Sequence, residues 1–100
     1  MKTIKIKDWS EIPKKYTGIV EYEHGDKQWW LNGNLHREDG PAIEWANGDK
    51  EWYLNDKQHR INGPAVECVN GIKVYYINGK EVIKEAQEVL YAMYKLKGLL

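Results

Sequence analysis

A 23-residue period dominates this sequence and limits the folds that it can adopt. The segment Gly63-Pro64-Ala65-Val66-Glu67 aligns with Gly40-Pro41-Ala42-Ile43-Glu44, and that segment aligns with Thr17-Gly18-Ile19-Val20-Glu21. The period covers residues 17–85 without a gap. A period of about 20 to 50 residues is typical of one supersecondary unit stacked in a row, in which each copy buries its neighbour's apolar face. Such rows make extended surfaces more often than catalytic clefts, so the period first predicts a binding protein.

The composition fits one small domain that carries an uneven charge. The chain has 100 residues and a formal net charge of zero, but residues 17–85 hold eight Lys and Arg against twelve Asp and Glu. A mildly acidic body without a basic stripe does not suit a phosphate backbone, so nucleic acid is not the expected partner. The sequence has no apolar run of membrane-spanning length and no signal peptide, which predicts a cytoplasmic protein that does not bind membranes. Cys68 is the only cysteine, so neither a disulfide framework nor a thiol metal site is expected.

Each repeat reads as a β-hairpin. Short segments that alternate apolar and polar residues, such as Ile43-Glu44-Trp45, are typical of half-buried strands. They are followed by turn pairs such as Asn47-Gly48, whose residues both accept positive φ. Second strands are expected at 27–31, 50–54 and 73–77, and each closes on a further turn pair, as at Asn55-Asp56. The fold class expected is mainly β: an antiparallel meander of three 23-residue hairpin repeats.

Alternation with a period of two assigns the side chains to two faces. The residues expected on the core face are Val20, Tyr22, Trp29, Leu31, Ile43, Trp45, Trp52, Leu54, Val66, Cys68, Tyr75 and Ile77. The residues expected on the opposite, polar face are Glu21, Glu44 and Glu67 with Gln28, Glu51 and Val74, and one aromatic residue per repeat at Trp30, Tyr53 and Tyr76.

The aromatic column gives the first candidate binding surface. Tyr and Trp dominate the energetics of protein interfaces, so a partner-binding site is predicted at Trp30, Tyr53 and Tyr76 with Glu44, Glu51 and Glu67 at its rim. The alternative is structural: each ring covers its own hairpin and pairs with Ala42 or Ala65 across the strand.

The two ends of the chain read as separate elements of the same single domain. Residues 1–16 are expected to form an edge strand, Lys2–Lys7, blunted by lysines and followed by a connector. Residues 80–98 are expected to form a helix with an apolar stripe, at Val82, Ile83, Ala86, Val89, Leu90, Met93 and Tyr94. This helix should cover the apolar face of the sheet. The same stripe offers a second use, homodimerisation.

The loops between repeats carry the only motif whose side chains suit catalysis or ligand binding. His36-Arg37 recurs as His59-Arg60, each followed by Gly-Pro-Ala. A His-Arg pair suits acid–base chemistry or phosphate binding, and these four residues form an alternative ligand site. The structural interpretation is favoured: Gly-Pro fixes the strand entry, and His and Arg tie the crossing backbone to the next turn. Equivalent residues two strands apart lie about 9.5 Å from each other, too far to share a zinc ion. No metal, cofactor or catalytic residue is predicted, and an enzyme is not expected.

The segment Gly48-Asp49-Lys50-Glu51-Trp52-Tyr53-Leu54-Asn55 resembles the MORN repeat variant, a hairpin of about 23 residues with an aromatic pair before an Asn-Gly turn. The His-Arg-Glu-Asp-Gly-Pro-Ala form is similar to a subtype found in phage, bacterial and giant-virus proteins. The resemblance covers residues 17–85. It departs from the pattern at Asp56, where Gly is usual, and in the third unit, which lacks His-Arg. It implies the fold, and lipid or protein binding as the kind of role.

Together these observations predict a non-enzymatic protein-binding module. The resemblance to phage proteins suggests a specific version, an inhibitor that blocks a host defence protein or other host enzyme by steric occlusion in the host cytoplasm. Two further classes are kept open. One is a nucleotide sponge, in which Arg37 and Arg60 hold a phosphate, and the other is a self-associating scaffold.

Overall fold

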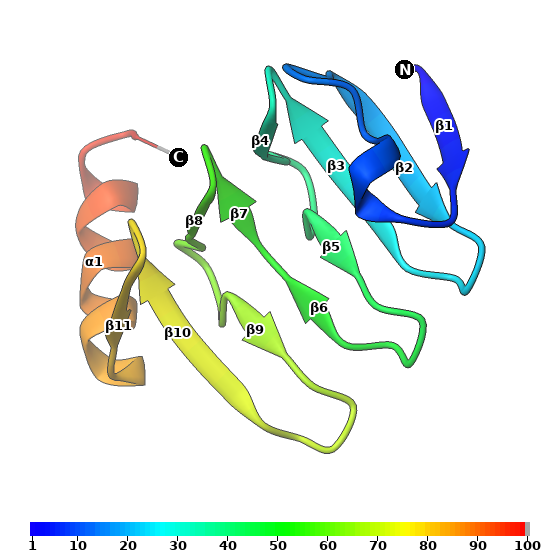
Figure 1. The fold of residues 1–100 in the computed structure, drawn as a ribbon. Coiled ribbons are helices and arrows are strands. Elements are labelled where there is room, and N and C mark those ends of the chain that lie inside the picture. The colour runs from blue at the N-terminus through cyan, green and yellow to red at the C-terminus, as the bar shows by residue number, and fades with distance from the viewer. Residues whose placement is uncertain (100) are drawn as a thin grey trace.

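The computed structural model describes residues 1–99, and these fold into a row of short strands with one helix at its end (Figure 1). The strands are β1 (Thr3–Ile6), β2 (Gly18–Tyr22), β3 (Lys27–Leu31), β4 (Asn34–Leu35), β5 (Ile43–Glu44), β6 (Lys50–Glu51), β7 (Tyr53–Leu54), β8 (Lys57–Gln58), β9 (Val66–Glu67), β10 (Lys73–Ile77) and β11 (Lys80–Val82). A 3-10 turn, η1 (Trp9–Glu11), follows β1, and the helix α1 (Lys84–Leu96) ends the row. The predicted mainly β class, with an N-terminal strand and a C-terminal helix, is confirmed.

One sheet contains most of the strands, in the order β1-β2-β3-β5-β6-β9-β10-β11. The long strand β3 pairs with β2 along one side, and on its other side with β4 near its end and β5 near its start. The expected second strand at 50–54 is divided into β6 and β7, and β7 pairs with β8 in a separate hairpin. The pairs are antiparallel except that β1 lies parallel to β2 at the edge of the sheet. The first and third units therefore supply three strand segments each and the second supplies four, instead of the two per unit that the sequence pattern predicts.

The first turn of each unit is longer than predicted, and this changes the faces of the sheet. In the second unit the Trp45 amide donates to the Asp49 carbonyl at 2.9 Å, which leaves a three-residue loop. Gly48 alone has positive φ in that loop, at 99°. Ile43 therefore lies opposite Glu51 and not opposite Trp52. A change of one residue in register moves every side chain of the second strand to the other face.

The predicted core face was therefore wrong for half of its members. One face of the sheet, here called the Val20 face, carries residues that lie directly opposite one another in successive strands, namely Val20, Gln28, Ile43, Glu51, Val66 and Val74. The other face, here called the Trp29 face, carries Trp29 and a row of alternating charges in the same strands: Glu21, Lys27, Glu44, Lys50, Glu67 and Lys73. The three glutamates of the predicted polar surface thus lie on the face opposite to Glu51. Two residues expected in the core, Leu31 and Trp45, are 36% and 38% exposed.

Burial is concentrated at the N-terminal end of the row. Val20 is fully buried and packs with Ile6 and Tyr16, and Trp30 lies against this cluster. The Tyr16 hydroxyl donates to the Ile19 carbonyl at 3.0 Å, which satisfies its polar group inside the cluster. The connector between β1 and β2 is therefore part of the core.

Aspartates at the first turns connect neighbouring units. The Asp26 carboxylate accepts a hydrogen bond from the Ala46 amide at 2.8 Å. The Asp49 carboxylate accepts the equivalent bond from the Val69 amide at 2.9 Å. The third unit has Ile72 in place of the aspartate, and that residue is 55% exposed. The same contact thus recurs along the row and ends where the chain offers no further hairpin.

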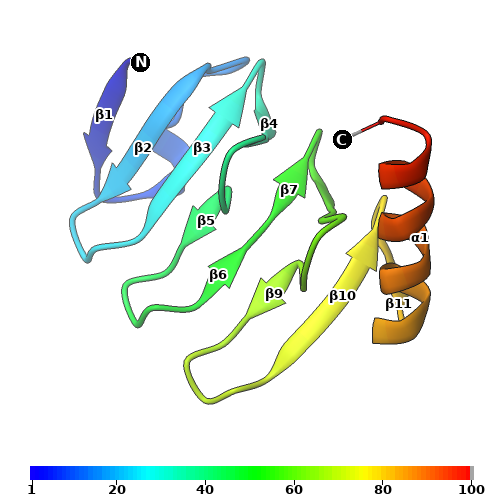
Figure 2. The same cartoon turned by 180° about the vertical axis from the view of Figure 1, so that it is seen from behind.

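Helix α1 lies beside β10 and β11 beyond the last strands of the row, as both views of the molecule show (Figures 1 and 2). Gln87 is its buried residue, and the Gln87 amide donates to the Ile61 carbonyl. Val89 and Met93 of the predicted stripe are 60% and 45% exposed. The prediction that this stripe covers the sheet holds only in part: of its residues in α1, Leu90 and Tyr94 are partly buried on the side that carries Gln87, whereas Ala86, Val89 and Met93 are exposed. The expectation that the stripe forms a dimer remains a prediction.

Candidate functional site

The His-Arg segments form two loops that project from the sheet. In the first loop, the His36 amide donates to the Trp29 carbonyl at 3.0 Å, and the Arg37 amide donates to the Tyr53 carbonyl at 3.1 Å. The chain then leaves the sheet and returns at Ala42, whose amide donates to the Glu51 carbonyl. The second loop makes the same bonds with His59 and Arg60. Both loops therefore begin at fixed positions on neighbouring strands.

Each loop is held closed by its own arginine. The Arg37 guanidinium carbon lies 3.8 Å from the centre of the Trp29 ring. Its Nη1 donates to the Pro41 carbonyl at 3.1 Å, and its Nε donates to Asp39 at 3.0 Å. Nη1 also pairs with Glu44 at 3.5 Å. Stacking on an aromatic face and donation to a carboxylate are the two interactions that the planar guanidinium makes best.

Arg60 repeats this arrangement with one difference. It stacks on Trp52 at 3.9 Å and donates to Pro64 and Glu67. Its Nε donates to the amide oxygen of Asn62, at 3.3 Å, where Arg37 has the carboxylate of Asp39. An asparagine can therefore replace this aspartate in the loop without loss of the hydrogen bond.

The glycine of each loop gives the arginine its space. A Cβ at Gly40 would lie 2.8 Å from the Arg37 guanidinium carbon, and a Cβ at Gly63 would lie 2.8 Å from that of Arg60. These distances are shorter than a van der Waals contact, so a side chain at either glycine would displace the arginine from the place that it occupies.

The two histidines have a structural role. His36 Nδ1 accepts a hydrogen bond from the Asn55 amide at 3.0 Å, and His59 Nδ1 accepts one from the Asn78 amide at 2.9 Å. Each histidine thus ties its loop to the turn of the next unit, as the structural interpretation predicted. Burial lowers the pKa of His59 from its ordinary 6.5, because the charged imidazolium is poorly hydrated there. Among residues 1–99 no group of three or more His, Cys, Asp or Glu side chains is placed to hold a metal ion.

This role predicts a loss of stability in acid. Nδ1 can accept the Asn78 bond only while the His59 ring is neutral. A base whose pKa is lowered by folding contributes stability above its unfolded pKa, and that stability is lost as the pH falls towards the folded pKa. We expect the melting temperature to fall between pH 7.5 and pH 5. His59→Asn keeps an acceptor oxygen near the place of Nδ1 and does not titrate, so its melting temperature should fall less. Equal pH profiles for the two proteins would contradict this role.

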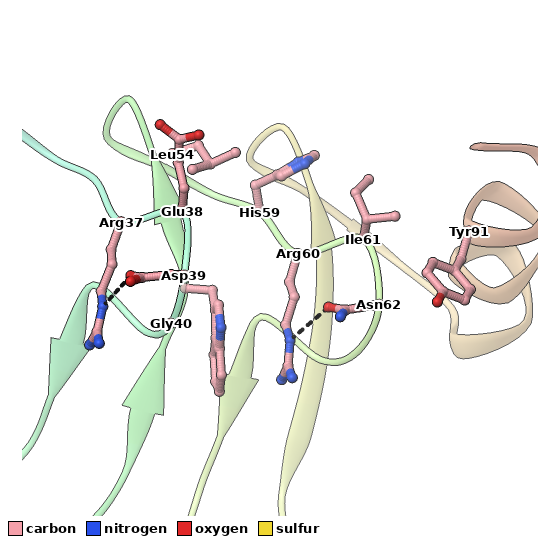
Figure 3. Close-up of a pocket in the computed structure, with 11 residues that line it drawn as sticks. Arg37, Glu38, Asp39, Gly40, Leu54, His59, Arg60, Ile61, Asn62 and Tyr91 are labelled. Atoms are coloured by element: carbon pink, nitrogen blue, oxygen red, sulfur yellow. Dashed lines mark hydrogen bonds and ion pairs between the residues drawn. The ribbon is translucent and has the colours of Figure 1, made fainter. Parts of the chain in front are cut away.

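A groove of about 610 Å³ lies on the Trp29 face beside the two loops (Figure 3). Its walls are the two loops, and Tyr91 of α1 lines it as well. Figure 3 shows the Arg37 and Arg60 side chains extending from neighbouring loops in the same direction, with Tyr91 beyond Asn62. The full lining consists of Arg37, Glu38, Asp39, Gly40, Trp52, Leu54, His59, Arg60, Ile61, Asn62 and Tyr91.

The groove brings together three of the four residues of the predicted alternative ligand site. Arg37, His59 and Arg60 line it, whereas His36 does not. The sequence interpretation missed the other lining residues. The difference between Glu38-Asp39 and Ile61-Asn62 was available as a signal, since these pairs are related by the 23-residue period. Nothing in the sequence indicated that Tyr91 lines the groove, because the position of its side chain depends on how α1 packs against the sheet.

The predicted partner surface does not form one patch. Trp30 lies on the Val20 face against the buried cluster, and its indole donates to Gln28 at 3.0 Å. Tyr53 donates to Glu51 at 3.0 Å, and burial followed by the nearby Glu51 charge raises the pKa of its phenol. Tyr76 has the equivalent position in the third unit. The remaining two residues, Glu44 and Glu67, bind the arginines on the Trp29 face.

No protein-family profile, curated protein sequence or solved structure matches this chain. Within residues 1–99, none of the helical structure has the length and apolar character needed to cross a bilayer.

Proposed function

We propose that this protein is a non-enzymatic module that binds another protein through the groove on its Trp29 face. The observation that carries the proposal is the open form of the fold. The accessible surface is 6675 Å², whereas a compact monomer of this mass exposes about 5,900 Å². An open sheet with a concave site offers a partner a large surface.

The composition of the groove favours a protein over a small molecule. Apolar side chains at Trp52, Leu54, Ile61 and Tyr91 stand among charged ones, and aromatic rings surrounded by polar groups are typical of protein interfaces. The nucleotide alternative is less well supported. Nε and Nη1 of both Arg37 and Arg60 already donate to acceptors of the protein, and a phosphate would stand close to carboxylates.

Occlusion of a host enzyme, as the resemblance to phage proteins implies, is one specific form of this proposal. A rigid sheet that docks through a groove would block a partner's active site sterically and would need no chemistry of its own.

The test is affinity capture from a bacterial lysate, followed by reconstitution of the complex from the purified captured protein. We expect a stoichiometric complex by size-exclusion chromatography with light scattering. Glu38→Trp should weaken it at least ten-fold, because the Glu38 side chain is 82% exposed at the groove wall and a bulky ring there fills the groove. Glu88→Trp is the matched control on α1, where the Glu88 side chain is 59% exposed and does not line the groove.

Two results would contradict the proposal. One is the absence of any stoichiometric partner together with a nucleotide released on heating, which mass spectrometry would detect and which would favour the sponge. The other is a complex that Glu38→Trp and Glu88→Trp leave equally strong, since the partner would then bind elsewhere.

A further inference from the structure

The two loops beside the groove present different side chains to it. The first loop offers two carboxylates, and the Glu38 and Asp39 side chains are 82% and 87% exposed. The second loop offers Ile61 and Asn62 at the equivalent positions. At these two positions, one wall of the groove carries two carboxylates and the other carries no charge.

The charged side chains that the groove lining exposes most are acidic. The two guanidinium groups that line it, those of Arg37 and Arg60, are already paired with Glu44 and Glu67 outside the lining. The side chains of Arg37 and Arg60 are only 22% exposed, whereas those of Glu38 and Asp39 are 82% and 87% exposed, so the charge that the lining exposes is negative. His59 adds no charge at neutral pH, because burial lowers its pKa. A cationic group is therefore the complementary ligand.

The contacts of Arg37 show which groups bind a cation beside the groove. Arg37 is bound by an aromatic ring, by carboxylates and by a backbone carbonyl. The groove offers the first two of these groups again, in the Tyr91 ring beside the Trp52 ring that Arg60 already covers, and in the exposed carboxylates of Glu38 and Asp39, which also contact His36 and Arg37. The Tyr91 ring carries no cation of its own among the contacts of residues 1–99.

We propose that the groove receives an arginine side chain from a basic segment of the partner protein. Its guanidinium pairs with Glu38 and Asp39, and its aliphatic stem packs against Ile61 and the aromatic rings. Arginine fits better than lysine, because its planar fork pairs with carboxylates in two bonds and stacks on rings. This inference names the ligand of the groove and rests on the proposed function.

The first test uses peptide probes. Acetylated and amidated hexa-arginine, hexa-lysine of equal charge, and ADP are titrated into the protein by isothermal calorimetry at low salt. We expect hexa-arginine to bind several-fold more tightly than hexa-lysine, and ADP not to bind. Equal affinity for the two peptides would overturn the proposal in favour of unspecific charge attraction. Preferential binding of ADP would overturn it in favour of a phosphate site.

The second test removes the two negative charges by amide substitutions of nearly the same shape. In the double variant Glu38→Gln with Asp39→Asn, the new asparagine takes the role that Asn62 has beside Arg60. We expect hexa-arginine to bind about ten-fold more weakly, because a bidentate pair between a guanidinium and a carboxylate contributes more than an isolated exposed ion pair. The reverse pair, Ile61→Glu with Asn62→Asp, should bind more tightly. Unchanged affinity in both variants would refute the arginine site.

The outcomes also separate this inference from the proposed function. If Glu38→Trp abolishes the protein complex but Glu38→Gln with Asp39→Asn leaves it at full strength, the groove is a docking site for a partner that inserts no arginine. If no partner protein forms a complex while hexa-arginine binds as expected, the groove chemistry is correct and the proposed function is wrong.

Discussion

Trp29→Ala should lower the free energy of unfolding by about 3–5 kcal/mol, as removal of a buried aromatic side chain typically does. Trp29 is 8% exposed, and its ring is the surface on which the Arg37 guanidinium stacks. The substitution therefore opens a cavity and also releases the arginine that closes the first loop. Such a loss is a large part of the 5–15 kcal/mol that stabilises a typical domain, so the variant should be largely unfolded at 37 °C.

The matched control for this experiment is Trp45→Ala. The sequence pattern placed both tryptophans in the core, but Trp45 is 38% exposed and its indole donates to Glu51 at 2.6 Å. We expect a cost of about 1–2 kcal/mol, for one hydrogen bond and part of a ring. Urea unfolding of the two variants gives the comparison. Equal losses, or a larger loss for Trp45→Ala, would contradict the register described here.

Gly18→Ala is expected to have the second largest effect, a loss of about 3 kcal/mol. Gly18 has φ of 144°, which side chains rarely adopt. A Cβ there would lie 2.5 Å from the Lys2 carbonyl oxygen and 2.6 Å from the Tyr16 hydroxyl. The Lys2 carbonyl oxygen also accepts a hydrogen bond from the Ile19 amide at 2.7 Å. Because this oxygen belongs to the backbone, β1 must move away from β2 to make room for the Cβ. Overpacking of this kind costs about 1–3 kcal/mol before the backbone strain is added.

Gly71→Ala separates the two causes of this effect. Gly71 also has positive φ, at 95°, but a Cβ there meets nothing within 4 Å. It should lose only the roughly 1–2 kcal/mol of backbone strain. Thermal unfolding monitored by circular dichroism would show the difference. If Gly71→Ala destabilised the protein as much as Gly18→Ala, the contact between β1 and Gly18 would not be the cause.

The sequence was sufficient for the hairpin of each unit, but not for the further strand segments β4, β8 and β11 or for the register of the strands. Alternating residues and Asn-Gly pairs correctly indicate hairpins, because strand propensity and turn chemistry are local. Asn47-Gly48 can form a two-residue turn or the end of a three-residue loop. The choice depends on the hydrogen bonds of the loop, which the amino-acid sequence does not specify. The one additional loop residue places Trp52 on the face opposite Ile43. It also reverses the face assigned to every other side chain of the second strands.

The candidate site was predictable only where it depends on local sequence. The repeated His-Arg-x-x-Gly-Pro segment marks both loops, and the tie between each histidine and the next turn follows from the period. The stacking of Arg37 on Trp29, and the space that Gly40 leaves for it, depend on a loop that leaves the plane of the sheet. The place of Tyr91 depends on the rotation of α1, which a wide apolar stripe leaves undetermined. Non-local packing therefore decides which residues line the groove.

On the proposed function, the partner docks on the Trp29 face and not on the Val20 face. The chain has five tryptophans, and two of them report on opposite faces: Trp52 lines the groove, and Trp30 packs on the Val20 cluster. The indole N–H signals of ¹⁵N-tryptophan-labelled protein, assigned with single Trp→Phe variants, follow both faces in one spectrum. Upon addition of the captured partner, we predict that the Trp52 signal shifts or broadens while the Trp30 signal stays in place. A shift of Trp30 with an unchanged Trp52 signal would contradict the claim and restore the aromatic column as the binding surface.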